Sequence, residues 1–377
     1  MIISYPIFFI NYKILEGELM SYLIMAGIDY ENSNLETREK VSFTHSAIKR
    51  AYEKIKCEGK LKETVIVSTC NRSEIYGISE VNKGEEYLKN FYSSFFNIDS
   101  DEAEKNIVLR TGFQVIYHLF QVTNGFKSMV LGEDQILGQV KDAYKQALIN
   151  KSSGKILNRL FLNSITDAKK VKTQTVLTNT SVSVSAIGIK LIHSHFKSLK
   201  GKKALVVGLG KMSKLAIQYL LAEGISKIYV TNRTRKKILD VENMAENIEG
   251  IDFKCKEKAF KDVDIIVSCT SAPHFVIHKD EFVNNYNGGP MCILDLALPR
   301  DVEPQIEKIE NVTLYVIDDI KTIADKNAKK KIVEYEKGME FVKEDVIKYI
   351  HWLNNEAIEL TGCNNVTKLV FQEGISV

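Results

Sequence analysis

The feature that most restricts the fold is a regular alternation of short apolar runs and helical stretches that begins at Lys202. The run KALVVG predicts a buried strand, and KMSKLAIQYLLAEG then places apolar residues on one helical face and stops at Gly224. Further strands are predicted at KIYVTN, VDIIVSCT, CILDLAL and TLYVID. Strands separated by helices favour a doubly wound parallel sheet, which is an α/β fold.

Two glycines lie between the first of these strands and its helix. Gly208 and Gly210 stand where main-chain N–H groups can approach a pyrophosphate, and Ser213 occupies the place of a third glycine. Strand, glycines, helix and a further strand in this order predict a dinucleotide site, although a tight turn without a ligand is the simpler alternative.

The next strand ends in TNRT, where NAD-preferring sites usually carry an acidic residue. Arg233 and, close behind it, Arg235 offer guanidinium groups instead. A guanidinium suits a 2′-phosphate, so NADP(H) is favoured over NAD(H); an arginine that only caps the loop remains the alternative.

The N-terminal half of the chain has a different texture. Strands are predicted near YLIMAGIDY and ETVIVSTCNRSEIYGIS, with amphipathic helices around SAIKRAYEKI and EEYLKNFYSSFF, which together indicate an α+β domain. The segment 155–200 is expected to be helical and to lead from one domain to the next. A highly charged helix of some length is predicted after Asp319.

That last helix carries a narrow apolar seam at alternating spacings of four and three. This is a coiled-coil period. The seam can be buried in two ways: against the other domains of the same molecule, or against the same helix of a second subunit. Pairing with a second subunit is the preferred interpretation. The seam consists of Ala328, Ile332, Tyr335, Met339, Val342, Val346, Tyr349 and Leu353.

Composition excludes little. The 377 residues are 45% hydrophobic and 26% charged, as in an ordinary globular protein, and a net charge of +3 argues neither for nor against a nucleic-acid partner. The six cysteines show no metal-type spacing, so no metal site is predicted, and free thiols fit a reducing cytoplasm. The apolar start is too short for a membrane span; residues 1–19 are expected to be translated leader ahead of Met20.

The stretch STCNRSEIYG places a thiol in polar company. If residues 65–72 are extended, Cys70 and Arg72 project from the same face, and the cation favours the thiolate. A buried core cysteine is the competing interpretation. Among later candidates, His118 is expected on a polar helical face away from the core. Glu133 favours the positive end of the next helix, whose polar stripe includes Gln135 and Gln139.

These stretches together resemble the glutamyl-tRNA reductase family. The resemblance rests on STCNRSEIYG, NGFKSMVLGEDQILGQVKDAY, SVSVSA, VVGLGKM, TNRT and LDLALPRDVEP in the family's order, and covers about residues 22–353. It implies NADPH-dependent reduction of tRNA-bound glutamate to glutamate-1-semialdehyde through a cysteine thioester, the first step of tetrapyrrole synthesis. It further implies glutamyl-tRNA(Glu) as substrate, an aminomutase as a partner, a cytoplasmic location and a homodimer through the C-terminal helix.

The resemblance also implies roles for individual residues. Cys70 matches the nucleophile, His118 a histidine suited to protonate the leaving ribose oxygen, and Arg72 the residue that holds the substrate carboxylate. The substrate pocket is expected to comprise Thr69, Asn71, Arg72, Ser128, Glu133, Gln135 and Gln139. The NADPH site is expected to comprise Gly208, Leu209, Gly210, Lys211, Met212, Asn232, Arg233 and Thr234.

The expected domains are a catalytic domain (20–165), an NADP-binding domain (166–318) and a spinal helix with a shortened dimerisation region (319–377). The chain departs from the family pattern at Tyr30, Lys127 and Asp134, and little sequence follows Leu353. Two alternatives stay open: a dehydrogenase of small acids or aldehydes that does not use tRNA, and an inactive paralogue that binds tRNA or a partner enzyme.

Overall fold

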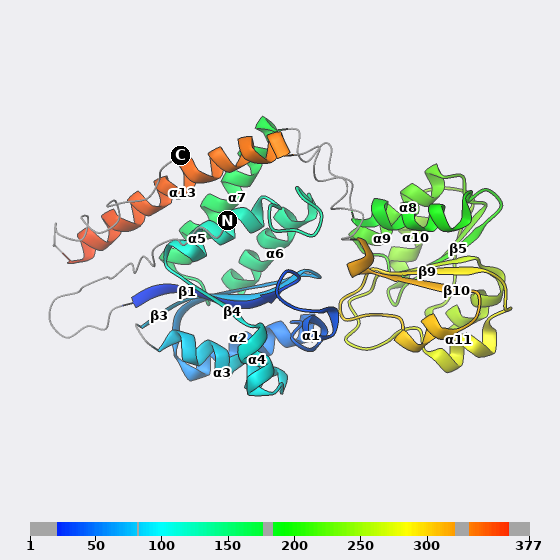
Figure 1. Cartoon of the computed structure of the whole chain (residues 1–377), viewed down its shortest axis with the longest axis horizontal. Helices are drawn as coiled ribbons and strands as arrows, with labels where there is room; N and C mark the ends of the chain where they lie inside the picture. The colour runs from blue at the N-terminus through cyan, green and yellow to red at the C-terminus, as the bar shows by residue number, and fades with distance from the viewer. Residues whose placement is uncertain (1–20, 81–82, 176–183, 321–331, 362–377) are drawn as a thin grey trace. The chain divides into compact units, whose positions relative to one another are not determined.

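The computed structural model describes residues 21–80, 83–175, 184–320 and 332–361, so the expected leader lies outside the described residues. The chain forms two compact units. The first contains the residues up to Ser181 and those from Lys330 onward, and the second runs from Val182 to Lys329. Each unit has its own sheet and its own core (Figure 1).

The first unit is built on an antiparallel sheet with strand order β2-β3-β1-β4. The central strand β1 is buried along almost its whole length, because helices cover both faces of the sheet. The strands are β1 (Ser21–Asp29), β2 (Leu61–Ser68), β3 (Arg72–Glu80) and β4 (Val108–Thr111).

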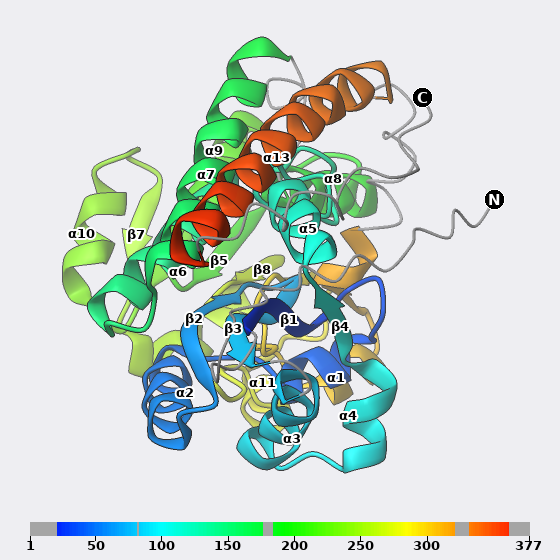
Figure 2. The same cartoon turned by 90° about the vertical axis from the view of Figure 1, so that its left-hand side faces the viewer.

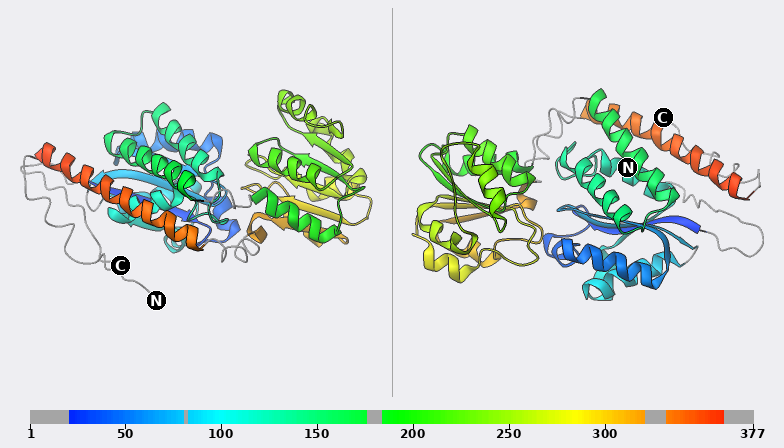
Figure 3. Two further views of the ribbon diagram at one scale, coloured as in Figure 1. Left: turned by 90° about the horizontal axis from the view of Figure 1, so that it is seen from above. Right: turned by 180° about the vertical axis from the view of Figure 1, so that it is seen from behind.

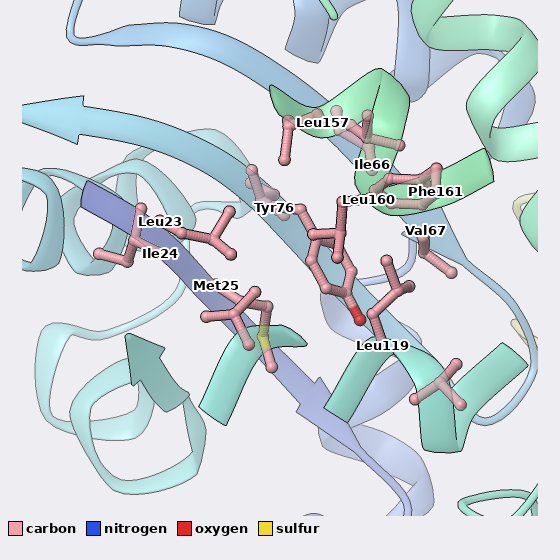
Figure 4. Packing of buried hydrophobic residues seen from close by; sticks show 14 of the residues in the cluster. Leu23, Ile24, Met25, Ile66, Val67, Tyr76, Leu119, Leu157, Leu160 and Phe161 are labelled. Atoms are coloured by element: carbon pink, nitrogen blue, oxygen red, sulfur yellow. The ribbon is translucent and has the colours of Figure 1, made fainter. Parts of the chain in front are cut away.

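Helices α2, α3 and α4 lie on one side of this sheet and α5, α6 and α7 on the other (Figure 1). Figure 4 shows how Tyr76 of β3 packs against Leu160 and Phe161 of α7 in the core between sheet and helices. The helices are α1 (Leu35–Lys40), α2 (His45–Glu58), α3 (Gly84–Phe96), α4 (Ser100–Asn106), α5 (Phe113–Thr123), α6 (Gln135–Ile149) and α7 (Lys155–Gln174). The domain boundary expected between residues 165 and 166 falls inside α7.

The long C-terminal helix α13 (Ile332–Thr361) runs along α7 and α5 of the same unit (Figures 2 and 3). Gly338 allows a close approach, since a Cβ there would lie 2.6 Å from the Phe126 ring. The buried residues of the seam are Met339, Val342, Val346, Tyr349 and Leu353.

The preferred pairing of this seam with a second subunit is therefore wrong. Helices α5 and α7 of the same chain cover it, because their own apolar faces need the same covering. At the start of α13, Ile332 is 50% exposed and Tyr335 packs on Phe126 with ring centroids 5.0 Å apart. Ala328 lies outside the described residues.

The second unit confirms the predicted doubly wound sheet. Six parallel strands stand in the order β10-β9-β8-β5-β6-β7, so the sheet reverses direction of winding between β5 and β8. The strands are β5 (Lys203–Val207), β6 (Lys227–Thr231), β7 (Ile248–Gly250), β8 (Ile265–Ser268), β9 (Met291–Asp295) and β10 (Val312–Val316).

Helices cover both faces of this second sheet as well (Figure 1). On one face α8 packs beside α9, and on the other η1 packs beside α11 over a core that includes Phe260 and Phe282. The helices are α8 (Val184–Phe196), α9 (Lys211–Ala222), α10 (Arg235–Glu242), η1 (Phe253–Asp262), α11 (Lys279–Asn285) and η2 (Pro304–Lys308).

Candidate active site and cofactor site

Cys70 lies in the tight connection of the β2–β3 hairpin. The Thr69 N–H donates to the Arg72 carbonyl at 2.8 Å, and the Asn71 N–H donates to Thr69 Oγ1 at 3.1 Å. The expectation of one extended strand over residues 65–72 is therefore wrong, since β2 ends at Ser68 and β3 begins at Arg72. The turn places the thiol at the tip of the hairpin instead of on a sheet face.

Opposing effects act on the thiol of Cys70, which is partly exposed. Burial raises its pKa to about 12; the carboxylate of Glu133 adds to that rise, and Arg38 and Arg72 oppose it. The expected effect of the cation is present, since Arg72 lowers the pKa, but it is smaller than the effect of burial. Desolvation of the anion outweighs the attraction of the two arginines.

Glu74 is the centre of this site, and the sequence analysis missed it. Its carboxylate is 1% exposed and accepts from Arg72 Nη1 at 2.7 Å, Tyr76 Oη at 2.7 Å and His118 Nε2 at 2.8 Å. Burial raises its pKa, but Arg72 and His118 outweigh burial and hold the pKa well below its ordinary value. Arg72, Glu74 and Tyr76 are alternate residues of β3, so their side chains project from the same face of the sheet. This spacing could have identified Glu74 from the sequence.

His118 is buried, contrary to the expected polar face. It is 3% exposed because α5 lies between the sheet and the helices α7 and α13. Burial lowers the pKa of His118, and Glu74 only partly opposes that effect. The imidazole is therefore neutral near pH 7, with its Nε2–H donated to Glu74.

The loop between α5 and α6 is fastened to Arg72. Arg72 Nη2 donates to the Lys127 carbonyl, and the Gly132 N–H closes the loop on the Gly125 carbonyl at 3.0 Å. Gly125 has φ +73°, and a Cβ there would lie 3.0 Å from the Glu133 nitrogen. This folding buries Ser128 and Glu133, at 6% and 7% exposure. Burial raises the pKa of Glu133 to about 7, with Arg72 opposing.

Three buried polar atoms of this region have no hydrogen-bond partner among the described residues. They are Asn71 Oδ1, Arg72 Nε and Gln135 Nε2, one acceptor and two donors. Buried polar groups are usually satisfied, so the unsatisfied atoms of Asn71 and Arg72, which follow Cys70 in the hairpin, indicate a place for a polar ligand. Gln139 lies one turn further along α6, half-buried.

The glycine turn of the second unit has the geometry that a pyrophosphate needs. Gly208 has φ +84°, and a Cβ there would lie 2.5 Å from the Cys269 carbonyl oxygen, so only glycine fits. A Cβ on Gly210 would meet nothing within 4 Å, which leaves open space before α9. No side chain caps that helix at Gly210, so its first N–H groups face this space with Lys211 and Met212 in the first turn.

The end of β6 borders the same turn. Asn232 Oδ1 accepts from the Leu209 N–H at 3.3 Å, and its Nδ2 donates to the Thr234 carbonyl at 3.2 Å. Arg233 is exposed, with its guanidinium 5.4 Å from the Phe253 ring centroid and 3.4 Å from His274 Nε2. Asn232 thus ties the two motifs together, while Arg233 presents a charge to solvent.

The structure thus brings Cys70, Arg72 and Glu133 together in the first unit, and the glycine turn and Asn232 together in the second. No contact joins Gln135 or Gln139 to Cys70 among the interactions of the described residues. Within the described ranges, no group of three or more His, Cys, Asp or Glu side chains is arranged to hold a metal. None of the helices in those ranges combines the length and apolarity needed to cross a membrane.

Comparison with known proteins covers both units. Residues 26–175 match the family model of the glutamyl-tRNAGlu reductase N-terminal domain, and residues 190–323 match that of shikimate / quinate 5-dehydrogenase. A solved glutamyl-tRNA reductase from Methanopyrus kandleri aligns at 28% identity and a TM-score of 0.49, over 89% of this chain and 81% of that one.

Full-length relatives are closer in sequence. The glutamyl-tRNA reductase of Clostridium novyi is 39% identical over 92% of this chain and 82% of its own length. That of Alkaliphilus metalliredigens is 38% identical over 88% of this chain and 78% of its own length. The chain belongs to the glutamyl-tRNA reductase family.

Proposed function

We propose that this protein reduces the glutamate carried by tRNA(Glu) to glutamate-1-semialdehyde with NADPH, the first step of tetrapyrrole synthesis from glutamate. The observation that carries the proposal is Cys70 at the hairpin tip, beside buried donors and an acceptor that lack partners. Membership of the family supplies the reaction, and this chain retains the thiol that the reaction needs.

We place the substrate carboxylate at Arg72 and Gln135, whose buried Nε and Nε2 atoms have no partner among the described residues. Arg72 donates one hydrogen bond from Nη1 to Glu74 and one from Nη2 to the Lys127 carbonyl, and its Nε–H has no partner. A guanidinium has five N–H groups, so donors remain for a ligand. Arg72 is proposed to bind the carboxylate through its Nε–H and its other unused N–H groups, and Gln135 Nε2 is proposed as a further donor. Ser128 and Thr69 are proposed to border the same pocket.

Cys70 performs two tasks in turn. Its sulfur attacks the ester carbonyl of the charged tRNA, the bond to the terminal ribose oxygen breaks, and the proton lost by the thiol ends on that oxygen. In the second half of the reaction the same sulfur leaves as a thiolate when the aldehyde forms. A thiol serves both halves because the thiolate is a good nucleophile and a good leaving group.

His118 fits a positioning role better than that of proton donor to the ribose oxygen. Its neutral imidazole already gives its Nε2 proton to Glu74, which leaves Nδ1 with none to donate. His118 and Tyr76 orient the Glu74 carboxylate, and Glu74 in turn fixes the Arg72 guanidinium.

The glycine turn at Gly208 and Gly210 is the part of the second unit that suits NADPH. The first N–H groups of α9 would bind the pyrophosphate, and Arg233 would pair with the 2′-phosphate. Asn232 and Thr234 would fix the loop that carries Arg233. When bound, NADPH supplies the hydride that converts a thioester to an aldehyde.

The test is Cys70→Ser with Cys57→Ser, an exposed cysteine, as the matched control. Cys70→Ser should lower the rate of NADPH oxidation with charged tRNA by at least roughly a thousandfold, because a hydroxyl is a poor nucleophile without a strong base. Without NADPH, the wild type and Cys57→Ser should retain labelled glutamate at position 70. Label at another cysteine, or oxidation with uncharged tRNA, would contradict the proposal.

The same proposal implies a partner enzyme, a cellular location and a possible homodimer. The reactive aldehyde needs an aminomutase to consume it, and charged tRNA is available in the cytoplasm. A homodimer through the C-terminal helix would have to use the outward face of α13, where Ile332 and Val333 are 50% and 73% exposed. Sedimentation of Val333→Glu against the wild type tests that contact.

A further inference from the structure

Two buried aspartates lie at the end of β9 and in the loop after it, in a stretch that the cofactor motifs do not include. Asp295 is 1% exposed and Asp301 is 0% exposed. Asp295 accepts from the main-chain N–H groups of Ala297, Asp301 and Val302 at 2.8 to 3.0 Å. Its carboxylate therefore fixes the backbone that carries Asp301.

Asp301 reaches from this loop to the end of the neighbouring strand β8. Its Oδ2 accepts from Ser268 Oγ at 2.8 Å and from the Thr270 N–H at 2.7 Å, and its Oδ1 accepts from Thr270 Oγ1 at 2.5 Å. Thr270 Oγ1 accepts in turn from the Ala272 N–H at 3.1 Å. The side chain of Asp301 thus orders the first residues of the loop after β8.

The main chain of Asp301 holds the other end of the same loop. Its carbonyl accepts from the Val276 N–H at 2.6 Å and from the Ile277 N–H at 2.9 Å. One residue therefore ties both ends of the segment 269–277. Such a residue defines the course of that loop, since a loop with both ends fixed has few conformations left.

This loop is the wall against which the glycine turn packs. The Cys269 N–H donates to the Val207 carbonyl at 3.0 Å, and a Cβ on Gly208 would lie 2.5 Å from the Cys269 oxygen and 2.9 Å from Thr270 Cγ2. β5 and β8 meet here, at the reversal of the sheet, where ligands of such folds bind. A shift of Thr270 would change the space left for Gly208 and the turn after it.

We propose that Asp301 is a positioning residue for the dinucleotide: it fixes the loop 269–277 against Gly208 and thereby sets the shape of the turn that receives the pyrophosphate. The inference rests on the proposed NADPH site. A buried carboxylate suits the task because its two oxygens accept three hydrogen bonds from two residues at once.

Two variants of the full chain test the proposal through the NADPH dissociation constant, measured by nucleotide fluorescence without tRNA. Thr270→Val removes one anchor and keeps the side-chain shape, and it should raise the constant by about three- to fivefold. Asp301→Ala removes all three side-chain anchors and should raise it by at least about tenfold. Thr313→Val, a half-buried threonine on the edge strand β10, is the matched control and should bind as the wild type does.

A purely structural role would leave the affinity of the folded protein unchanged. Asp301→Asn should restore most of the affinity, because its amide oxygen can accept from Ser268 and the Thr270 N–H while its amide donates to Thr270 Oγ1. Hydrogen exchange in Asp301→Ala should rise in the peptides containing 208 and 269–277 and stay unchanged in β10.

Each outcome decides the question. Wild-type affinity in Thr270→Val overturns the proposal, and this variant decides alone if Asp301→Ala does not fold. Failure of the wild type itself to bind NADPH would refute the proposed function, which is a different result from a wild type that binds and variants that bind equally well.

Discussion

The two candidate sites are built in opposite ways. In the first unit Glu74, Arg72 and His118 are buried side chains that hold one another in place. In the second unit the cofactor turn depends on missing side chains, with Gly208 in tight contact and Gly210 facing open space. The site in the first unit is a network of hydrogen-bonded side chains, whereas the site in the second unit is formed by the backbone of the glycine turn.

This difference has an energetic cause. A small polar substrate needs fixed donors, and buried charges can be fixed only if each is paired, which makes the network sensitive to the loss of any member. A pyrophosphate needs several N–H groups at close range, which backbone supplies if no Cβ intervenes. Substitutions that remove a charge should therefore disrupt the first site, and substitutions that add a Cβ should disrupt the second.

The largest effect on stability is expected when the charge network is broken. Glu74→Gln removes the carboxylate that is hydrogen-bonded to the buried Arg72 guanidinium and should lower the free energy of unfolding by about 3 to 5 kcal/mol. Urea unfolding followed by the single tryptophan, Trp352 of α13, reports on this unit.

The matched control is Glu53→Gln, at an exposed pair with Lys49 whose atoms are 3.9 Å apart. It should change the same free energy by less than about 0.5 kcal/mol. Equal decreases in the free energy of unfolding of the two variants would show that the buried network stabilises the fold no more than an exposed ion pair does.

The glycine turn offers a steric counterpart. Gly208→Ala should weaken NADPH binding and lower stability by about 1 to 3 kcal/mol, since its φ and the Cys269 oxygen both oppose a Cβ. Gly210→Ala should weaken NADPH binding and leave stability unchanged, because its new methyl group enters open space. Calorimetry with and without NADPH separates the two, and normal binding by Gly210→Ala would contradict this account of the turn.

A smaller effect is expected at the one charge proposed for the cofactor site. Arg233→Asp should shift preference from NADPH toward NADH by more than about tenfold, because a charge-assisted phosphate contact is lost. The ratio of the two dissociation constants measures it. An unchanged ratio would assign the 2′-phosphate to another cation, with Arg235 next along the chain.

The smallest effect concerns the thiol itself. Glu133→Gln removes a charge that raises the pKa of Cys70, so alkylation of Cys70 by iodoacetamide at pH 8 should be a few-fold faster, on the order of three to ten. The pKa of Glu133 is about 7, so at pH 6 the carboxyl is mostly protonated and the gain should largely vanish. Mass spectrometry resolves the alkylated site, with exposed Cys57 as internal reference. A gain of equal size at pH 6 would exclude the charge as its cause.

The sequence predicted most of the second unit and less of the first. Parallel strands, glycines and the TNRT ending are local patterns, and the structure has them in the predicted order. The hairpin at Thr69–Asn71 was taken as extended strand, because apolar run and polar turn follow one another without a glycine or proline to mark the break. The prediction for His118 relied on its sharing a helical face with Gln114 and Gln121. It is wrong because α5 is buried on more than one side.

By itself the sequence determined the parallel sheet with its glycine turn, since periodicity and short motifs express local backbone preferences. The tertiary structure alone decided that Glu74 joins Arg72 to His118, 44 positions further along the chain, and that α13 folds back to cover its own seam. Those pairings depend on which apolar faces pack against each other. The sequence does not specify this, because many helices and strands in one chain have the same hydrophobic repeat. Only the packing of the whole unit selects among them.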